Sequence, residues 1–599
     1  MENRTYAAGG AFLLNGVDPR RVFLPEMLTA EDTLIGKTAE DFLRQEVLPL
    51  ANTIETGDHA LMADLMRKAG ALGLLGADVP EIYGGLGLKQ TTAALISEKL
   101  NPQQSFALTH EAHTVIATLP LLYFGTHDQK SRYLPKLASG EWIGSFALSE
   151  ANSGSDALAM QTRATLTPDG RHYSLRGEKM WITNTAFADL FTVFAKVDGS
   201  KVTAFLVERN SPGLSFGKEE HKLGMHGTST RRLILEDVLV PVENALEVGK
   251  GHYAAFCALN LGRFKLEAGA VGGLKWLLAT CAAYASQRKT FGRPIAEYGL
   301  IQHKLAEMCA RTFALESMVY RLANDLDNAF DGIVPEAHDA SDLYHRAAEE
   351  YSVECSIVKV IGSETYSLMA DEAIQIHGGY GYTEEFPVAR AWRDQRLLRI
   401  GEGANEIVRL AIVNTLLRRD KAGRLKVLDA GRQASAELMQ AEVPNPELFN
   451  DGIDALGGIA HDIRSTAIFL LYQAADQFGT ELMENQEVVA AIADLVCMAY
   501  CVESVHVRCL RLQTAPPPRF EAMLLAAEVV GQWAGEEAHR AARFVLDALP
   551  GVEDIVDWRD EPFTGIRNLL DRLIRRDTNP ATLRRQLATA VLARNSYPF

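Results

Sequence analysis

The stretch Arg399-Ile400-Gly401-Glu402-Gly403-Ala404-Asn405-Glu406-Ile407 places one glutamate between two glycines. A glutamate held in this way can enter a tight site without water. There, loss of hydration raises the carboxyl pKa towards that of a useful base. The ordinary alternative is a loop carboxylate in solvent, which is the commoner fate of a glutamate. The surrounding sequence has to decide between these two interpretations of Glu402.

Two stretches further upstream combine small or aromatic residues with hydroxyl groups. Residues 146–156, Phe-Ala-Leu-Ser-Glu-Ala-Asn-Ser-Gly-Ser-Asp, run from an expected strand into a loop of small side chains. Such a loop lets backbone N–H groups approach a flat polar ring or a phosphate. In residues 179–184, Lys-Met-Trp-Ile-Thr-Asn, the indole can stack on an aromatic cofactor and the threonine can donate a hydrogen bond to it. Taken singly, the first stretch is more often a plain turn and the second a packed tryptophan.

Two further stretches suit phosphate groups. In residues 287–292, Gln-Arg-Lys-Thr-Phe-Gly, the arginine and threonine can bind a pyrophosphate and the phenylalanine can cover an adenine. Alone, this stretch is only a basic helix end. In residues 375–382, Gln-Ile-His-Gly-Gly-Tyr-Gly-Tyr, the glycines allow close approach to a phosphate, although alone they are a helix C-cap. His377 has no second histidine or carboxylate at ligand spacing, so we expect no metal there.

In this order and at these spacings, the five stretches resemble the acyl-CoA dehydrogenase family. The resemblance runs from about residue 35 to 420 and includes Leu223–Thr230 and Leu235–Pro241. The residues after 420 resemble the extension of the very-long-chain branch. The implied fold is mainly α with a small middle β domain. Its four parts are N-terminal helices (1–145), a β barrel-like domain (146–250), a four-helix bundle with the catalytic glutamate (251–420) and an extra C-terminal helical domain (421–599).

The resemblance implies FAD as the cofactor. Ser149 and Thr183 would contact the edge of the isoalloxazine ring, and Trp181 would cover one face. Residues 288–291 would reach the FAD of the neighbouring subunit and residues 375–379 would hold its pyrophosphate end, so a homodimer is the smallest competent unit. The implied cofactor-binding residues are Phe146, Leu148, Ser149, Gly154, Ser155, Trp181, Thr183, Arg288, Thr290, Phe291, Gln375, Gly379, Ala404 and Glu406.

The resemblance also implies that Glu402 is the catalytic base. Some relatives carry the base at the position of Gly262, where glycine cannot serve. Glu402 would take the pro-R α-proton of an acyl-CoA while the β-hydride moves to flavin N5, giving a trans-2-enoyl-CoA. The thioester oxygen would accept hydrogen bonds from the Glu402 N–H and a flavin ribityl hydroxyl. Electrons would pass to an electron-transfer flavoprotein.

The implied substrate-binding residues are Ser155, Asn260, Arg263 and Gly403, with Arg263 as the anchor for the phosphates or adenine side of coenzyme A. Two departures from the family pattern lie beside the base. Gly401 replaces the usual aromatic residue, which widens the pocket or loosens Glu402. Ala404 replaces the usual threonine, which removes a hydroxyl from the flavin region. Both departures bear on the identity of the substrate, which we expect to be a long-chain acyl-CoA.

The composition argues against a nucleic-acid binder. The 599 residues carry a net charge of −17, whereas nucleic-acid binding leaves a basic footprint. The seven cysteines form no CxxC pair, and the N-terminus MENRTYAAGGAFLLNGVDPRR lacks the apolar core of a signal peptide, so we expect a cytoplasmic protein. The best candidate for a membrane span, Ala268–Ala285, contains Lys275 and is expected to be a buried helix.

Two other functions remain open on the same scaffold. An acyl-CoA oxidase would use O₂ as the acceptor and would release peroxide. A non-catalytic scaffold or assembly protein would keep the fold and dock a partner on residues 421–599. The intact Glu402 argues against a protein without catalytic activity.

Two sites in the C-terminal residues are weighed and not favoured. Leu583–Leu592, with basic residues among apolar ones, could lie on anionic lipid, but such a face normally packs on protein. Cys497, Cys501, His506 and Cys509 are close in sequence. On one helix, however, Cys497 and His506 face opposite sides, so we expect no zinc site.

Periodicity and turn signals predict the main elements. Helices are expected at 39–53, 60–74 and 91–100, in one long stripe at 301–322, and in the C-terminal region at 456–478, at 488–509 and in a segment that ends near Pro550-Gly551. Strands are expected at 190–197, 201–207 and 233–239.

Overall fold

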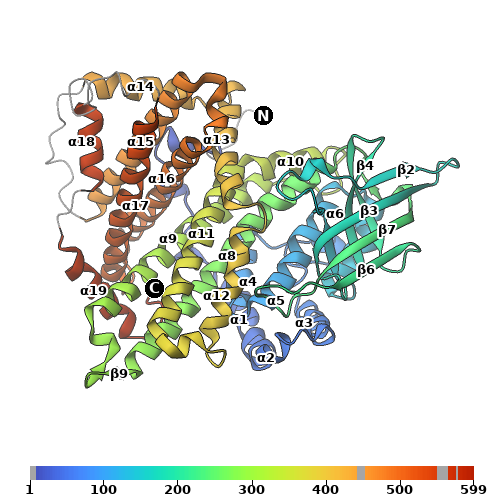
Figure 1. The fold of residues 1–599 in the computed structure, drawn as a ribbon, viewed down its shortest axis with the longest axis horizontal. Coiled ribbons are helices and arrows are strands. Elements are labelled where there is room, and N and C mark those ends of the chain that lie inside the picture. The colour runs from blue at the N-terminus through green and yellow to red at the C-terminus, as the bar shows by residue number, and fades with distance from the viewer. Residues whose placement is uncertain (1–7, 441–451, 550–563, 575–577) are drawn as a thin grey trace.

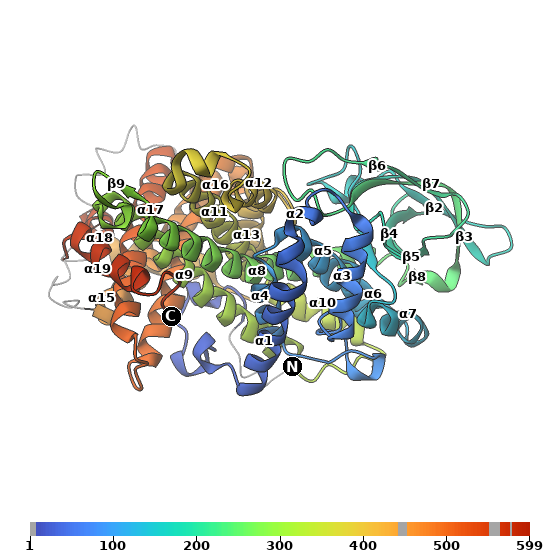
Figure 2. The ribbon, with the colours of Figure 1, turned by 90° about the horizontal axis from the view of Figure 1, so that it is seen from below.

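The computed structural model describes residues 8–440, 452–549, 564–574 and 578–599. The expectations for the first seven residues and for a helix end at Pro550-Gly551 lie outside these ranges. Figure 1 shows a β sheet at one end of the molecule, a central body of long helices, and further helices from the C-terminal part of the chain at the other end. Figure 2 shows the N-terminal helices lying against the central body next to the sheet.

The N-terminal region is helical, as predicted. Its α-helices are α1 (Ala30–Phe42), α2 (Ala51–Ile54), α3 (His59–Ala71), α4 (Gln90–Leu100), α5 (Gln104–Glu111), α6 (Leu119–Phe124) and α7 (His127–Ser139). The helices expected at 60–74 and 91–100 correspond to α3 and α4. Residues 39–53, expected to be helical, are helical as the end of α1, two helical turns over 43–50 and most of α2, but the helical run begins earlier, at Ala30. The chain enters α1 through a capping box in which Thr29 and Asp32 each accept from the other's backbone N–H, a signal that the apolar periodicity did not include.

The β sheet has eight strands. They are β1 (Gly144–Ala147), β2 (Arg163–Leu166), β3 (His172–Thr183), β4 (Leu190–Val197), β5 (Lys201–Glu208), β6 (Leu214–Glu219), β7 (Thr230–Pro241) and β8 (Ala245–Leu246). Their order is β6-β7-β3-β2-β4-β5-β8, and β1 pairs in parallel with β4, with Gly144 opposite Leu190. Strand β4 has the predicted bounds, because a continuous apolar run between turns suits a strand buried on both faces. The pairing of β3 with β7 is irregular between Lys179 and Ile182.

The central body consists of long helices and one small hairpin. Its elements are α8 (Gly251–Gln287), β9 (Lys289–Thr290), β10 (Arg293–Pro294), α9 (Gly299–Phe330), α10 (Ala340–Glu350), α11 (Ser352–His377), α12 (Pro387–Asp394) and α13 (Asn405–Lys421). Helix α8 packs against α4, α9 and α11 and is apolar on all sides. The predicted buried helix at 268–285 lies within α8, so that prediction is confirmed.

The C-terminal helices form what we call the extension. They are α14 (Val427–Gln440), α15 (Gly452–Phe478), α16 (Gln486–Leu512), α17 (Phe520–Ala548), α18 (Thr564–Leu573) and α19 (Pro580–Leu592). Among the described helices, α16 alone is long and apolar enough to cross a membrane, and 89% of its apolar window is buried against protein. It packs against α9, α11 and α13 of the central body. The apolar face of α19, with Leu583 and Leu587 fully buried, is covered by α9 and α17, which leaves no such face for lipid.

Candidate active site

Glu402 lies in the connection between the helical turn Gln395–Arg399 and α13. We call residues 401–404 the base loop. The Glu402 carboxylate faces Gly262 in the first third of α8. A Cβ atom built on Gly262 would lie 3.1 Å from Oε2 of Glu402 and 3.3 Å from Cγ2 of Ile116. The two positions at which the resemblance implies a base therefore face each other, and glycine at 262 leaves room for the side chain of Glu402.

The surroundings of the Glu402 carboxylate favour its neutral form. Oε2 is buried and has no hydrogen-bond partner in the part of the chain that the structure describes. Burial raises the pKa of Glu402 to about 7, although the positive charges of Arg263 and Lys359 oppose this shift. A carboxylate that titrates near neutral pH and is left without a partner is suited to accept a proton from a substrate.

Two basic side chains hold the backbone of the base loop. Arg263 donates from Nε to the carbonyl oxygen of Glu402 at 2.9 Å, and Lys359 donates from Nζ to the carbonyl oxygen of Gly403 at 2.6 Å. Glu402 itself has a positive φ of 55°, and Gly403 has a φ of 101°. For glutamate this left-handed conformation is strained, so the neighbouring contacts must stabilise it.

The Arg263 side chain points towards the base loop. Besides Nε, its Nη1 donates to Oδ1 of Asn260 at 3.2 Å and to Oγ of Ser356 at 3.4 Å. Two guanidinium nitrogens of Arg263 therefore donate to groups inside the protein. Helix α8 is buried where it passes the base loop. The contacts of Arg263, Asn260, Ser155 and Gly403 with coenzyme A stay predictions.

The ends of β1 and β3 bring two of the predicted flavin-binding stretches together. Met180 donates its backbone N–H to the carbonyl of Ser149 at 2.9 Å, and Ser145 donates from Oγ to the carbonyl of Thr183 at 2.5 Å. Trp181 lies in the irregular part of β3, with a φ of 59° and an exposed fraction of 54%. A bulge re-aims a side chain, and here the large Trp181 indole is left exposed.

A buried ion pair holds the start of the loop of small residues that follows β1. Lys179 donates from Nζ to Oε1 of Glu150 at 2.8 Å and to the carbonyl of Leu148 at 3.1 Å, and Thr162 also donates to Glu150. At the loop tip, a Cβ atom on Gly154 would meet nothing within 4 Å. Glu150 and Lys179 lie within two of the predicted flavin-binding stretches, but no role was predicted for either. A glutamate in one stretch and a lysine in the other were the only sequence signal for this ion pair.

Phe146 and Leu148 are buried, unlike the rest of the predicted set on this side. The Phe146 ring packs edge-on against Phe194 at 4.9 Å. We therefore expect Phe146 and Leu148 to contact a cofactor through backbone groups. On α13, Ala404 is the N-cap residue without a side-chain cap, and Glu406 is exposed in the first turn.

The two stretches predicted to bind phosphate meet at the far end of α8. The Arg288 guanidinium lies 5.8 Å from the ring centre of Tyr380, which connects the end of α8 with the end of α11. Phe291 is 94% exposed, Gln375 is exposed, and a Cβ atom on Gly379 would meet nothing within 4 Å. Bare aromatic faces, open glycines and a nearby arginine fit a flavin dinucleotide at both stretches.

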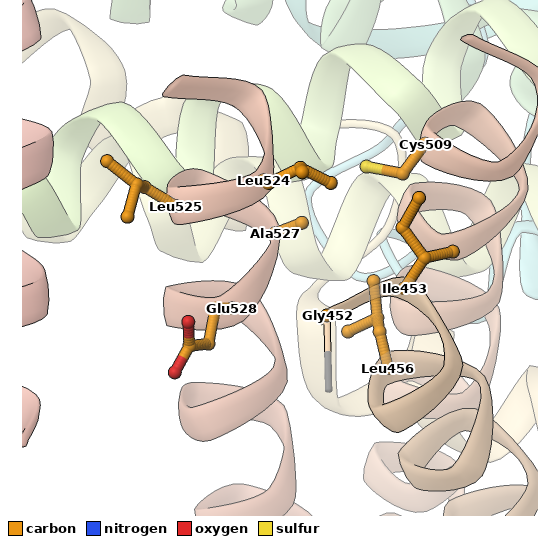
Figure 3. Close-up of a pocket in the computed structure, with 8 residues that line it drawn as sticks. All are labelled: Gly452, Ile453, Leu456, Cys509, Leu524, Leu525, Ala527 and Glu528. Carbon is orange, nitrogen blue, oxygen red and sulfur yellow. The ribbon is translucent and has the colours of Figure 1, made fainter. Parts of the chain in front are cut away.

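A groove and a cavity lie apart from these predicted site residues. A surface groove of about 660 Å³ runs between Leu223 and the helices α11 and α12, and includes Glu364, Trp392 and Arg396. A cavity of about 80 Å³ lies inside the extension between α15, α16 and α17 (Figure 3). Its lining is Gly452, Ile453, Leu456, Cys509, Leu524, Leu525, Ala527 and Glu528. This cavity is far smaller than the several hundred Å³ typical of ligand sites, and none of the predicted site residues reaches it.

Comparison with known families accounts for most of the chain. Models of the N-terminal, middle and C-terminal domains of acyl-CoA dehydrogenases match residues 29–141, 145–238 and 249–417. A further acyl-CoA dehydrogenase C-terminal domain matches residues 462–553, within the extension.

Individual relatives agree with these matches. A probable acyl-CoA dehydrogenase of Bacillus subtilis is 45% identical over 502 residues, 84% of each chain. The human mitochondrial very long-chain specific acyl-CoA dehydrogenase is 34% identical over 507 residues, 80% of this chain and 73% of the relative. The crystal structure of an acyl-CoA dehydrogenase complexed with FAD from Bacillus anthracis superposes with a TM-score of 0.93 at 40% identity, covering 99% of this chain and 100% of the other. The chain therefore belongs to the acyl-CoA dehydrogenase family, including its extra C-terminal domain.

Proposed function

We propose that Glu402 removes the α-proton of an acyl-CoA thioester, in a protein that is an FAD-dependent acyl-CoA dehydrogenase. One observation carries this proposal: the buried, unpartnered Oε2 of Glu402 opposite Gly262, with a pKa raised to about 7. Burial is what makes a carboxylate basic enough to take a weakly acidic proton at neutral pH.

The chain offers complementary groups for the cofactor. Ser149 and Thr183 would hold the edge of the flavin ring, and Trp181 would cover one face with its exposed indole. FAD, when bound, supplies the acceptor for the hydride that leaves the β-carbon. The expected dinucleotide contacts also include Ser155 and Gly154 in the open loop, and Ala404 and Glu406 at the start of α13.

Glu402 has two roles in this mechanism. Its Oε2 takes the α-proton and thereby becomes neutral, which removes the cost of a buried charge. Its backbone N–H donates to the thioester oxygen and stabilises the negative charge that develops there. The contacts of Arg263 and Lys359 with the two adjoining carbonyl groups orient this N–H and the side chain together.

A homodimer is the assembly that the geometry supports. Helix α8 has 37 residues and extends about 55 Å at 1.5 Å per residue. Gly262 faces Glu402 near one end, whereas Arg288 follows the other end, about 40 Å further along. Both stretches predicted to bind phosphate therefore lie far from Glu402 of the same subunit. The residues at 288–291 and 375–379 of one subunit would therefore complete the FAD site of its neighbour.

The substrate is a long-chain acyl-CoA and the electron acceptor is an electron-transfer flavoprotein in this proposal. The identity with a relative named for very long chains and the match of the extension support the long chain. All seven cysteines are buried free thiols, which supports a reducing, cytoplasmic setting. Acyl-CoA oxidase is the second candidate. A dehydrogenase would turn over with a flavoprotein acceptor, whereas an oxidase would release peroxide in air.

Anaerobic titration of the purified yellow protein with a series of acyl-CoA chain lengths tests the proposal. We expect saturated long chains to bleach the flavin absorbance of the wild type. The Glu402→Gln variant is expected to bind FAD at the same stoichiometry while its reduction slows by about 10²–10⁴-fold, the usual contribution of a general base. Reduction of this variant at the wild-type rate would remove Glu402 from its role. Failure of every acyl-CoA to bleach the wild type would favour a scaffold protein.

A further inference from the structure

The base loop is strained and lacks the cap that would hold it. Glu402 and Gly403 both have a positive φ, and the next residue, Ala404, is the N-cap of α13. Alanine has no side-chain oxygen to accept from the first turn of the helix, and α13 has no side-chain cap bond at this end. A strained loop directly before an uncapped helix keeps its shape only if other contacts over-determine it.

A network of buried side chains supplies such contacts. Lys359 of α11 donates from Nζ to the carbonyl of Gly403 and to Oδ1 of Asn405, both at 2.6 Å. Asn405, the first residue of α13, donates from Nδ2 to Oγ of Ser363 at 3.1 Å and to Oε1 of Glu364 at 3.0 Å. The side chain of Asn405 therefore ties the end of the base loop to two successive turns of α11.

The network continues into the extension. Arg409, one turn along α13 from Asn405, holds Glu364 with two parallel bonds of 2.7 and 2.9 Å. Its Nε donates to Oδ1 of Asp494 on α16 at 2.7 Å. The Arg409 side chain is 16% exposed and that of Asp494 is 24% exposed, so both ends of this pair are largely removed from solvent. Bidentate arginine–carboxylate pairs fix geometry as well as charge.

Asp494 decides which way Arg409 is held. Arg409 is the only described cation in ion-pair contact with Asp494, and it bridges Asp494 and Glu364. Without the Asp494 charge, Arg409 would keep its bidentate pair with Glu364 but would lose its second anchor, on α16. Glu364 accepts from Asn405, and Asn405 accepts from Lys359, so a shift of Arg409 and Glu364 would pass along these two bonds to the base loop.

We propose that Asp494, on the extension, is a positioning residue for Glu402 and acts through Arg409, Glu364 and Asn405. This inference rests on the proposed function of Glu402 as the base. It gives the extension a part in the chemistry beyond packing, because α16 provides the outermost charge of a network that ends at the base loop.

The test uses the Asp494→Asn holoenzyme, which keeps the side-chain shape and removes the charge. We expect the maximal rate of flavin bleaching by the best acyl-CoA to fall about tenfold, since a small misplacement of a catalytic group has large effects on rate. The substrate concentration at half-maximal rate is expected to stay within about twofold, because no substrate contact is removed. Asp494→Glu should recover most of the lost rate by restoring the charge.

The matched control is Glu307→Gln on α9. Glu307 pairs with Arg584 of α19 at 2.7 Å and is 16% exposed, so it joins the same two regions with similar burial. Among the described residues, it makes no hydrogen bond or ion pair with the base loop. Its bleaching rate should match the wild type even if both variants unfold at lower urea concentrations. Equal bleaching rates in Asp494→Asn, Glu307→Gln and wild type would overturn the inference.

A second variant covers a failure of Asp494→Asn to fold with FAD. Arg409→Lys keeps the positive charge and loses the bidentate geometry, and it should show the same fall in maximal rate. Wild-type bleaching by Arg409→Lys holoenzyme would also overturn the inference. Undiminished bleaching by Glu402→Gln would instead overturn the proposed function on which the inference rests, so the two failures can be told apart.

Discussion

Two buried carboxylates in the central body of this protein have opposite surroundings. Glu402 has an oxygen without a hydrogen-bond partner among the described residues, and burial raises its pKa to about 7. Glu316 on α9 is also buried, but it contacts Lys275 at 2.5 Å and Arg508 at 2.8 Å and accepts from Tyr597 at 2.7 Å. Burial alone would raise the pKa of Glu316, yet the two cations lower it well below its usual range.

The difference separates a carboxylate that can accept a proton, Glu402, from one that can only form ion pairs, Glu316. At Glu316 the surrounding donors stabilise the charged form, so three helices and the C-terminal tyrosine are joined by it. At Glu402 the protein directs its cations to the backbone and leaves the side-chain oxygen free. Both sites use lysine and arginine, and what differs is the atom to which these donate.

Removing the Glu316 charge should have the largest effect on stability. Glu316→Gln leaves the buried Arg508 and the partly exposed Lys275 with one charged partner fewer, which we expect to lower the free energy of unfolding by about 3–5 kcal/mol. Urea unfolding of the holoenzyme measures this change. The bleaching rate of the remaining folded enzyme should be unchanged. A large loss of rate without loss of stability would break the comparison, because Glu316 would then act on the reaction.

The pH dependence should follow opposite directions at the two sites. Flavin reduction requires ionised Glu402, so its rate should rise about tenfold per pH unit and level off above about pH 7. Folding raises the pKa of the Glu402 carboxyl from 4.5 to about 7. The contribution of Glu402 to the free energy of unfolding therefore falls as the pH rises through this range. The contribution of Glu316, whose pKa is lowered, is present above 4.5 and is lost as the pH falls below it. Stopped-flow bleaching and urea unfolding across pH measure both. A rate independent of pH between 5 and 8 would contradict a base of this kind.

Filling the space opposite the base should sharpen the comparison. In Gly262→Ala, the new methyl group would lie 3.1 Å from Oε2 of Glu402, so the carboxylate must shift by a few tenths of an ångström. We expect the bleaching rate to fall by about tenfold or less, equivalent to at most about 1.4 kcal/mol, with FAD content unchanged. An unchanged rate would mean that the carboxylate tolerates displacement. The absorbance ratio of flavin to protein serves as the control.

The smallest expected effect concerns the missing cap. Ala404→Thr places a good N-cap residue before α13 and should stabilise the protein by about 1 kcal/mol. It should also slow the opening of the base loop, which hydrogen exchange of the amides at 402–406 would measure. Faster exchange in the variant would indicate that the hydroxyl binds elsewhere than to the helix end.

The sequence predicted local elements where the chain alone contains the signal. Strand β4 was predicted at its observed bounds, because its apolar run lies between turn residues. The start of α1 was missed, because a mostly polar first turn with a capping box carries little apolar periodicity. The order of the motifs led to the family, and Glu402 was singled out from its glycine neighbours.

The long-range contacts of the site could not be predicted in this way. Lys359 and Gly403 are 44 residues apart in the chain, and Arg409 and Asp494 are 85 apart. No periodicity or spacing rule relates residues on separate helices at such distances. The same holds for Arg263, whose side chain turns to the base loop only because α8 passes beside it.

By itself the sequence determined the kinds of groups present: a glutamate between glycines, a loop of small residues, a tryptophan close to a threonine, and the order of the motifs that is typical of the family. The tertiary structure decided what the glutamate can do. The pKa of a carboxylate depends on its distance from water and from charges, and both are set by helices that the chain brings together from far apart. The same residue type is therefore poised to take a proton at position 402 and locked in ion pairs at position 316.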